Sequence, residues 1–285
     1  MNDFSPDLSI KKKVQKKWQD STIRDNFVFS KTMEMNPELC RQLIGHILQT
    51  DIQEISYPER EKVIENRIDS KGVRLDVYVK DESERIFDLE MQVSEHSDEL
   101  ANRMRYYQGI IDGDNLKRGQ FYKDLKQTYI IFICPFDPFK RERHIYTFRE
   151  RCEEDPSLKL HENGTVKIFL STKGKIDDVS RELRDFLNYV ESGVINGSFV
   201  KKLDETVQSV KINEKARVEF MTYEMALLER ELKGREDMRL ELNQVISQKN
   251  QVIFHKDKEI ARLKEQLALA QKANNPKKTS KSFSR

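Results

Sequence analysis

The chain is 285 residues long, and 37% of its residues are hydrophobic while 35% are charged. This length is enough to bury a core without a disulfide or a metal, and the low apolar share indicates a long solvated helical part beside a folded body. The apolar runs are too short to span a membrane and the start lacks the apolar stretch of a signal peptide, so we expect a cytoplasmic protein with no membrane contact. Three cysteines with no CxxC spacing argue against both a disulfide framework and a zinc knuckle.

The charge is distributed unevenly along the chain, although the net charge is only +2. Basic residues gather at both ends, and the body from Trp18 to Ala270 is acidic. An acidic body does not bind nucleic acid tightly through bulk electrostatics, whereas two basic ends would add a salt-sensitive grip that is independent of sequence. The alternative is that the basic ends only keep the termini solvated.

The first regular element after the basic start is a helix expected from Pro37 to about Gln49. Asn36 is a good N-cap, Pro37 suits the first helical position, and Glu38 suits the helix dipole. Apolar residues then recur at helical spacing as far as Leu48.

Two strictly alternating segments follow, Val73 to Lys80 and Arg85 to Val93, joined by the polar turn 81–84. This alternation predicts two strands, and the short turn predicts a β-hairpin. One face of the hairpin is apolar and faces the core, and the other is polar and exposed. The polar face carries Arg74, Asp76 and Tyr78 on the first strand and Asp88, Glu90 and Gln92 on the second.

Helical and strand patterns then alternate up to the end of the second third of the chain. The expected elements are a helix over 97–112, strands over 128–134, 144–148 and 165–170, and a helix over about 178–190. Together they predict an α/β fold, with a mixed β-sheet flanked by helices. The Gly- and Ser-containing stretch from Ser192 to Ser198 is the best linker candidate.

Beyond this stretch the sequence follows a heptad pattern. The first positions, mostly apolar, are Val218, Met225, Leu232, Arg239, Ile246, Ile253, Ile260 and Leu267. The second positions are Met221, Leu228, Arg235, Leu242, Lys249, Lys256, Leu263 and Ala270. Isoleucine at the first position with leucine at the second favours a parallel two-stranded coiled coil, while the basic residues in the seam weaken it. The alternative is a helix that folds back on its own domain.

These patterns divide the chain into five parts. They are a basic leader (1–20), the α/β domain (21–192), a linker (193–205), a helical or coiled-coil segment (206–270) and a basic disordered tail (271–285).

The polar face of the hairpin brings carboxylates together. If the apolar faces share one core, strand parity allows Asp76 to lie opposite Asp88 or opposite Glu90, with Gln92 further along the same face. Opposed Cβ atoms are about 4.5–5.5 Å apart, so two carboxylates repel there unless a cation lies between them. Mg²⁺ suits such a place because it prefers hard oxygen ligands and one or two carboxylates. The alternative is an ordinary solvated face.

Five motifs occur in order along the chain. They are Phe27-Val28-Phe29, Asp76 within Gly72 to Val79, Asp88-Leu89-Glu90-Met91-Gln92, Arg103-Met104-Arg105-Tyr106-Tyr107-Gln108 and Cys134-Pro135-Phe136-Asp137-Pro138-Phe139. Together they resemble the PD-(D/E)XK nuclease superfamily, and most closely its branch of PD-(D/E)XK nuclease family transposases, also called recombination-promoting nucleases. The resemblance runs from about Ser21 to Val190 and implies a restriction-endonuclease-like core for the α/β domain.

The resemblance also implies roles for the hairpin residues. Asp76 and Glu90 would hold Mg²⁺, or Mn²⁺ in its place, with the Met91 carbonyl as a further ligand, and the metal would activate water for attack on a phosphodiester. Gln92 stands where the superfamily has a catalytic lysine, and glutamine orients water by hydrogen bonds but supplies no positive charge. The superfamily often adds an acid from its first helix, for which Glu34 and Glu38 are the candidates.

The helix after the hairpin carries the candidate DNA contacts, which are Arg103, Arg105, Tyr106 and Gln108. Arginine binds phosphate through paired N–H donors, and tyrosine stacks on bases. The alternative for this helix is one packed face and one solvated face.

The leading interpretation is a Mg²⁺-dependent DNA endonuclease that hydrolyses phosphodiester bonds, is linked to recombination or mobile DNA, and forms a homodimer through its C-terminal helix. One alternative is a catalytically silent nuclease-like module that binds DNA or assembles on it, which Gln92 and the acidic body favour. Another is a coiled-coil adaptor that never touches DNA.

Overall fold

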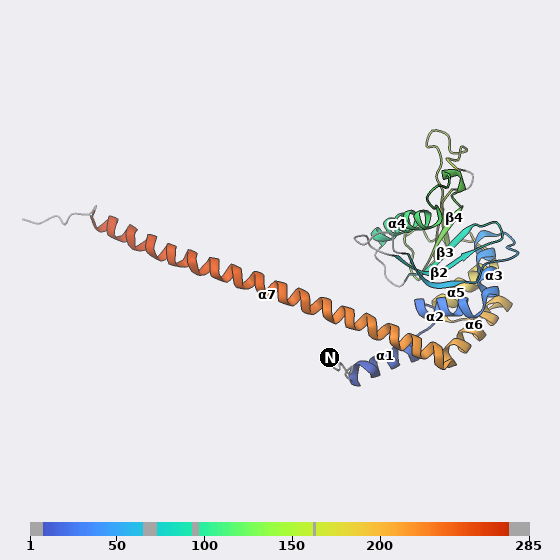
Figure 1. The fold of residues 1–285 in the computed structure, drawn as a ribbon, viewed down its shortest axis with the longest axis horizontal. Helices are drawn as coiled ribbons and strands as arrows, with labels where there is room; N and C mark the ends of the chain where they lie inside the picture. Colours follow the sequence, from blue (N-terminus) through green and yellow to red (C-terminus); the bar gives the residue numbers. More distant parts are fainter. Residues whose placement is uncertain (1–7, 65–72, 93–96, 162–163, 274–285) are drawn as a thin grey trace, which may run out of the picture. The chain divides into compact units, whose positions relative to one another are not determined.

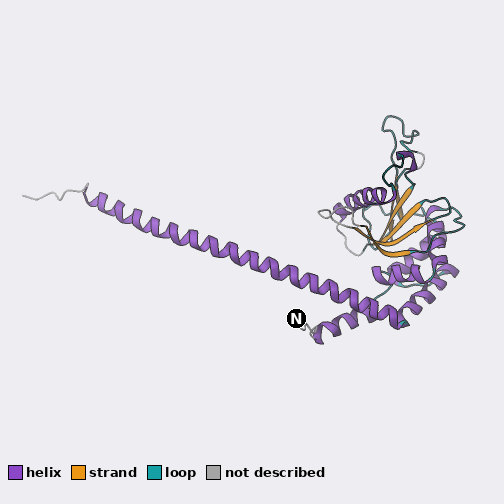
Figure 2. Cartoon of the chain, viewed as in Figure 1, coloured by secondary structure: helices purple, strands orange, loops and turns teal. Residues whose placement is uncertain are grey.

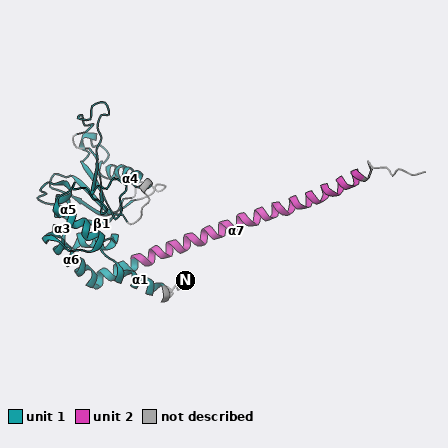
Figure 3. Ribbon diagram, turned by 180° about the vertical axis from the view of Figure 1, so that it is seen from behind, with its two compact units in different colours: residues 1–222 teal, residues 223–285 magenta. Residues whose placement is uncertain are grey.

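The computed structural model describes residues 8–64, 73–92, 97–161 and 164–273. The chain divides into two compact units, Met1–Thr222 and Tyr223–Arg285 (Figure 3). The first unit contains the β-sheet and every helix except the greater part of α7, which forms the second unit.

The first unit begins with three helices, α1 (Leu8–Asp20), α2 (Asn26–Met35) and α3 (Pro37–Leu48). The Asp25 carboxylate caps α2 by accepting hydrogen bonds from the backbone N–H groups of Phe27 and Val28. The Asn36 side chain accepts one from Leu39 at the start of α3, as its N-cap pattern predicts.

The segment expected to be a basic leader is helical where the structure describes it. α1 buries Val14 and Trp18, which are 2% and 4% exposed, while its lysines face solvent. The Trp18 ring packs on Phe27 and on Phe220 with centroids 6.2 and 5.0 Å away. This part of the chain therefore contributes to the core of the first unit.

Six strands form one mixed sheet (Figures 1 and 2). They are β1 (Glu59–Ile64), β2 (Val73–Lys80), β3 (Ile86–Met91), β4 (Thr128–Cys134), β5 (Ile145–Phe148) and β6 (Val166–Ser171), in the order β1-β2-β3-β4-β6-β5. The first three strands are antiparallel, β3, β4 and β6 run parallel, and β5 is antiparallel to β6. The expected α/β fold with a mixed sheet is thus confirmed.

Helices cover both faces of the sheet (Figure 1). α4 (Ser97–Asn115) lies on one face, where Met104 and Ile111 join Ile130 and Phe132 of β4 in one apolar cluster. The layer of α2, α3, α5 (Arg181–Ser192) and α6 (Gly197–Ile212) lies on the other, and the short 3-10 helix η1 (Tyr122–Asp124) precedes β4. Every residue of β4 is buried because both faces of this central strand are covered.

The hairpin β2–β3 forms as predicted, but the expectation of an exposed polar face is wrong. Asp76, Asp88, Glu90 and Gln92 are at most 5% exposed. The reason is that α4 packs over this face of the sheet, so the polar side chains are enclosed with the apolar ones.

The expected linker over 193–205 is also wrong. Only residues 193–196 separate α5 from α6, and α6 buries Phe199, Val200 and Leu203 in the first unit. The first unit extends further, because Phe220 in the early turns of α7 (Glu214–Ala273) is fully buried.

The second unit consists of α7 from Tyr223 onward, a continuous helix up to Ala273. Its heptad residues from Leu232 onward are exposed within this chain, with Ile253 at 55% and Ile260 at 49%. The long C-terminal helix is confirmed, and its pairing into a coiled coil stays a prediction. The expected disordered tail lies almost entirely outside the described residues. Among the helices that the structure describes, none combines the length and the apolar character needed to span a membrane.

Candidate active site

The site is built on the hairpin, where two acidic residues lie opposite each other. Tyr78 pairs with Asp88 and Val77 with Leu89, and this antiparallel register places Asp76 opposite Glu90. It is one of the two registers that parity allowed. The backbone N–H of Asp76 donates a 2.8 Å hydrogen bond to Glu90 Oε1, and the N–H of Met91 donates a 3.1 Å hydrogen bond to Asp76 Oδ2. The backbone of each strand therefore orients the carboxylate of the other.

A third carboxylate, Asp88, lies on the same face and is fully buried. Neither of its oxygens has a partner with hydrogen-bond geometry in the described part of the chain. A buried carboxylate without such partners is costly, so its presence calls for a proton or a cation.

Burial shifts the pKa of all three carboxyl groups upward. It raises the pKa of Asp76 to about 7, against the opposing hydrogen bond from Met91. Burial and then the charge of Asp76 raise the pKa of Asp88 and of Glu90 well above their ordinary values. Burial of three acids on one face of a hairpin therefore favours their protonated forms, unless a cation stabilises the charged forms.

An arginine of α4, Arg103, reaches the carboxylates on this face. Its guanidinium donates a 2.7 Å hydrogen bond to Gln92 Oε1 and a 3.0 Å hydrogen bond to the Tyr107 hydroxyl, and lies 3.8 Å from Glu90 Oε2. It also stacks over the Tyr107 and Phe132 rings at 5.5 Å from each centroid. These contacts hold the positive charge beside the carboxylates.

The donor set suits a hard divalent cation. Asp76 Oδ1 and Glu90 Oε2 remain outside the two backbone hydrogen bonds, and both oxygens of Asp88 lack partners among the described residues. Carboxylate oxygens of this kind are the ligands that Mg²⁺ and Mn²⁺ prefer. No group of three or more His, Cys, Asp or Glu side chains in the described ranges is already arranged around a common metal position.

The predicted DNA contacts on α4 are not brought together at this site. Arg103 faces the carboxylates, whereas Arg105 and Tyr106 line a separate surface hollow with Asn102 and Ile110. Gln108 donates its amide hydrogen bond along the helix to Asp112 instead.

The two candidates for an additional acid are bound in ion pairs. Glu34 pairs with Lys31 at 2.7 Å, and Glu38 pairs with Arg41 at the same distance. Glu38 is therefore paired with Arg41, and its position at the start of α3 is the one that suits the helix dipole.

Sequence reasoning missed three residues of the site, Asp88 as a site acid, Tyr107 and Glu61. The register of β1 with β2 places Glu61 opposite Asp76, on the side away from Glu90. Its charge adds to the rise in the pKa of Asp76. Two of them had a signal in the sequence. Asp88 alternates with Glu90 on the polar face of the hairpin, and Tyr107 follows Arg103 by four residues and so shares its face of the helix.

A protein-family model described as PD-(D/E)XK nuclease family transposase matches residues 26–163, a range that begins at the start of α2 and ends before β6. Neither the curated proteins nor the solved structures gave a significant match to the chain. The match contains the whole hairpin with Asp76 and Glu90, and it contains α4 with Arg103. We conclude that residues 26–163 of this chain match the PD-(D/E)XK nuclease family transposases.

Proposed function

We propose that the chain is a metal-dependent DNA endonuclease that acts on mobile or recombining DNA. The observation that carries the proposal is the opposed pair Asp76 and Glu90, buried with Asp88 on one face of the hairpin. Such an arrangement destabilises the fold unless it serves a cation or a proton. The family of residues 26–163 supplies the substrate class.

Asp76 and Glu90 are the residues that would hold Mg²⁺ or Mn²⁺, with the Met91 carbonyl as a further candidate. A bound divalent ion would supply activation of water and neutralisation of charge on the phosphate. The reciprocal backbone hydrogen bonds keep the two carboxylates from rotating, so the ligands are oriented before the ion arrives.

Gln92 and Arg103 together replace the lysine that the superfamily has at position 92. Gln92 cannot carry charge, but its side-chain oxygen binds the Arg103 guanidinium at 2.7 Å. Arg103 thus places a permanent positive charge next to Glu90, where a phosphate oxygen in the cleavage step would benefit from it. Gln92 would position this arginine and, through its amide group, a water molecule.

The test is nicking of supercoiled plasmid in Mg²⁺ by the wild type and by the variants Asp76→Asn and Glu90→Gln. Both substitutions keep the size of the side chain, and both retain an oxygen that accepts the backbone hydrogen bond. Glu205→Gln, which changes an exposed carboxylate on α6, is the matched control. We expect nicking by the wild type and the control, no nicking by either site variant, and none when Ca²⁺ replaces Mg²⁺.

The competing function is a silent nuclease-like module that binds DNA. Gln92 favours it, since the position has no lysine and its side-chain oxygen is already engaged. A wild-type protein that shifts DNA on a gel but never cuts it in Mg²⁺ or Mn²⁺ would establish this module and refute the endonuclease.

We further propose that α7 pairs with α7 of a second copy. The support is the heptad series of exposed apolar residues in the second unit, such as Ile246, Ile253 and Ile260. A long helix that exposes this stripe to water gains stability when another helix covers it. Two copies would bring two single-strand-cutting sites to one duplex.

A further inference from the structure

A polar hollow lies away from the carboxylates, at the edge of the sheet formed by the amino-terminal ends of its parallel strands. β3, β4 and β6 all begin at this edge, whereas Glu90 and Gln92 lie toward the carboxyl end of β3. The hollow has a volume of about 340 Å³ and is lined by Gln127, Val166 and the loop that contains Arg149, Arg151 and Lys159. None of these residues takes part in the carboxylate site.

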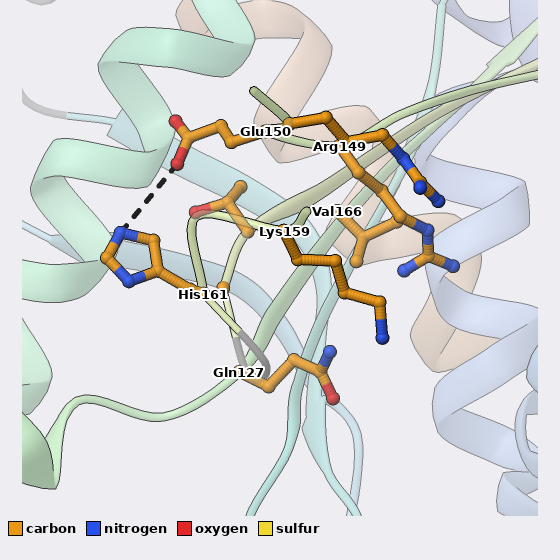
Figure 4. A pocket seen from close by; sticks show the side chains of 9 residues that line it. Gln127, Arg149, Glu150, Lys159, His161 and Val166 are labelled. Atoms are coloured by element: carbon orange, nitrogen blue, oxygen red, sulfur yellow. Dashed lines mark ion pairs between the residues drawn. The ribbon is translucent and has the colours of Figure 1, made fainter. Parts of the chain in front are cut away.

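The cations of this hollow share one side of it. Figure 4 shows Arg149 and Lys159 extending to the same side as the Gln127 amide, while His161 and Glu150 face each other on the other side. Glu150 is therefore turned away from these cations and lies 3.9 Å from His161. The other described acids of the loop, Glu153, Glu154 and Asp155, do not line the hollow. Arg149 is exposed and has no hydrogen bond or ion pair within the residues that the structure describes.

A second hollow of about 590 Å³ adjoins the first, and Gln127 lines both of them. It adds the cations Arg85, Lys123 and Lys126, together with one acid, Asp124. Arg85 is paired with Asp81, whereas Lys126 is exposed and makes no ion pair in the described part of the chain. The two hollows form a basic edge strip, which we define by Arg149, Arg151, Lys159, Lys123 and Lys126.

We propose that this basic edge strip binds phosphate groups of the DNA backbone at a distance from the cleavage site. Guanidinium and ammonium groups with an amide donor are the chemistry that recognises a phosphate oxygen. A strip of exposed cations across two open hollows suits a polymer with regularly spaced charges better than one small anion.

The spacing agrees with a duplex substrate. Gln127 precedes Phe132, the β4 partner of Glu90, by five residues, which corresponds to about 16 Å along an extended strand. One turn of duplex DNA spans about 34 Å, so a single duplex offers phosphates at both places. This step rests on the proposed function, because it takes DNA as the substrate.

The test compares two double variants with equal changes of charge. Arg149→Glu with Lys126→Glu alters the strip at two residues that lack partners in the described ranges. Lys201→Glu with Lys215→Glu alters two exposed lysines on α6 and at the start of α7 and serves as the control. The readout is fluorescence anisotropy of a labelled 30-base-pair duplex in Ca²⁺, titrated with protein at several NaCl concentrations.

We expect the strip variant to bind at least tenfold more weakly than the wild type, and the slope of log K against log salt to fall by about 2, since each lost phosphate contact lowers it by about 0.9. The control should keep the wild-type slope. Equal slopes for the two variants would overturn the proposal. If the slopes are equal, the unfolding temperature in millimolar inorganic phosphate shows what the strip binds instead. A rise for the wild type but not for the strip variant would identify the strip as a site for small anions rather than for DNA.

Plasmid nicking separates this inference from the proposed function. A protein that never cuts but loses salt-dependent binding in the strip variant refutes the endonuclease and leaves the strip standing. If the protein cuts DNA and the strip variant binds DNA with the same salt dependence as the control, only the proposal about the strip is refuted.

Discussion

Glu90 Oε1 accepts a 2.8 Å hydrogen bond from the backbone N–H of Asp76, the residue that lies opposite it on the neighbouring strand. Asp76 in turn accepts a hydrogen bond from the backbone of Met91. The orientation of the acid pair is thus tied to the pairing of β2 with β3. A change in hairpin register would separate the carboxylates and also remove the hydrogen bonds that orient them.

The first prediction concerns stability and pH in a metal-free buffer. Burial raises the pKa of Asp76 to about 7, so its proton is bound more tightly in the folded than in the unfolded chain. The contribution to stability is full below the unfolded pKa of about 4 and is lost as the pH rises through about 7. The unfolding free energy of Asp76→Asn, measured relative to that of the wild type, should therefore rise by about 2–3 kcal/mol as the pH goes from 5 to 8.

Urea unfolding in EDTA, followed by the fluorescence of the single tryptophan Trp18, measures this difference. Glu205→Gln should follow the wild type at both pH values. A difference between Asp76→Asn and the wild type that does not change with pH would contradict the prediction.

The second prediction concerns Mg²⁺. The ion must displace protons from the carboxylates, so its stabilising effect grows as the pH rises. In 10 mM Mg²⁺ the unfolding temperature of the wild type should rise more at pH 8 than at pH 6, and that of Asp76→Asn should barely change. Differential scanning fluorimetry provides the measurement, and an equal rise for both proteins would rule out ion binding at Asp76.

The third prediction concerns the cation beside the site. Arg103→Met removes the charge while keeping much of the packing on Phe132, and should lower kcat/KM for plasmid nicking by about 100-fold, the loss typical of one electrostatic donor. Adding Gln92→Lys to Arg103→Met should recover part of the rate, because lysine would return a charge to the hairpin. If the double variant cuts no faster than Arg103→Met, a positive charge at residue 92 does not replace the positive charge on α4.

The hairpin was predictable because β2 and β3 alternate with a period of two, and parity left only two registers. The choice between them depends on the turn, where Asp81 Oδ1 accepts hydrogen bonds from the backbone of Ser83 and Arg85. These bonds fix the turn length and hence the pairing of Asp76 with Glu90. Alternation alone does not specify them.

Burial of the polar face could not be read from the hairpin itself. It depends on α4, whose packing brings Arg103 to the acids, and no local pattern specifies which face a distant helix covers. β1 was missed because charged residues fill most of Glu59–Ile64 and Glu61 adopts a positive φ of 55°. α6 was mistaken for a linker because Gly197 and Ser198 open it, although apolar residues recur at helical spacing from Phe199 onward.

The fourth prediction tests the aromatic cluster that links α1 and α2 to the start of α7. The Phe220 ring lies 5.0 Å from Trp18 and 5.3 Å from Phe27 and is fully buried. Phe220→Ala should lower the unfolding free energy by about 3–5 kcal/mol and shift the Trp18 emission to longer wavelength in the native protein. Val218→Ala, which truncates an exposed neighbour, is the control. A loss below 1 kcal/mol would show that this cluster does not stabilise the first unit.

The last prediction tests the pairing of α7. Ile253→Lys with Ile260→Lys places two charges in the proposed seam, at residues that are exposed in the single chain. If two copies share this seam, the variant should become monomeric, whereas Lys249→Leu with Lys256→Leu should tighten the dimer by removing charges from the same stripe. Sedimentation equilibrium at several protein concentrations measures both effects.

Arg262→Glu with Glu265→Arg, which exchanges charges outside the first and second heptad positions, controls for altered charge on the helix. A wild-type protein that stays monomeric at 100 μM would refute the pairing.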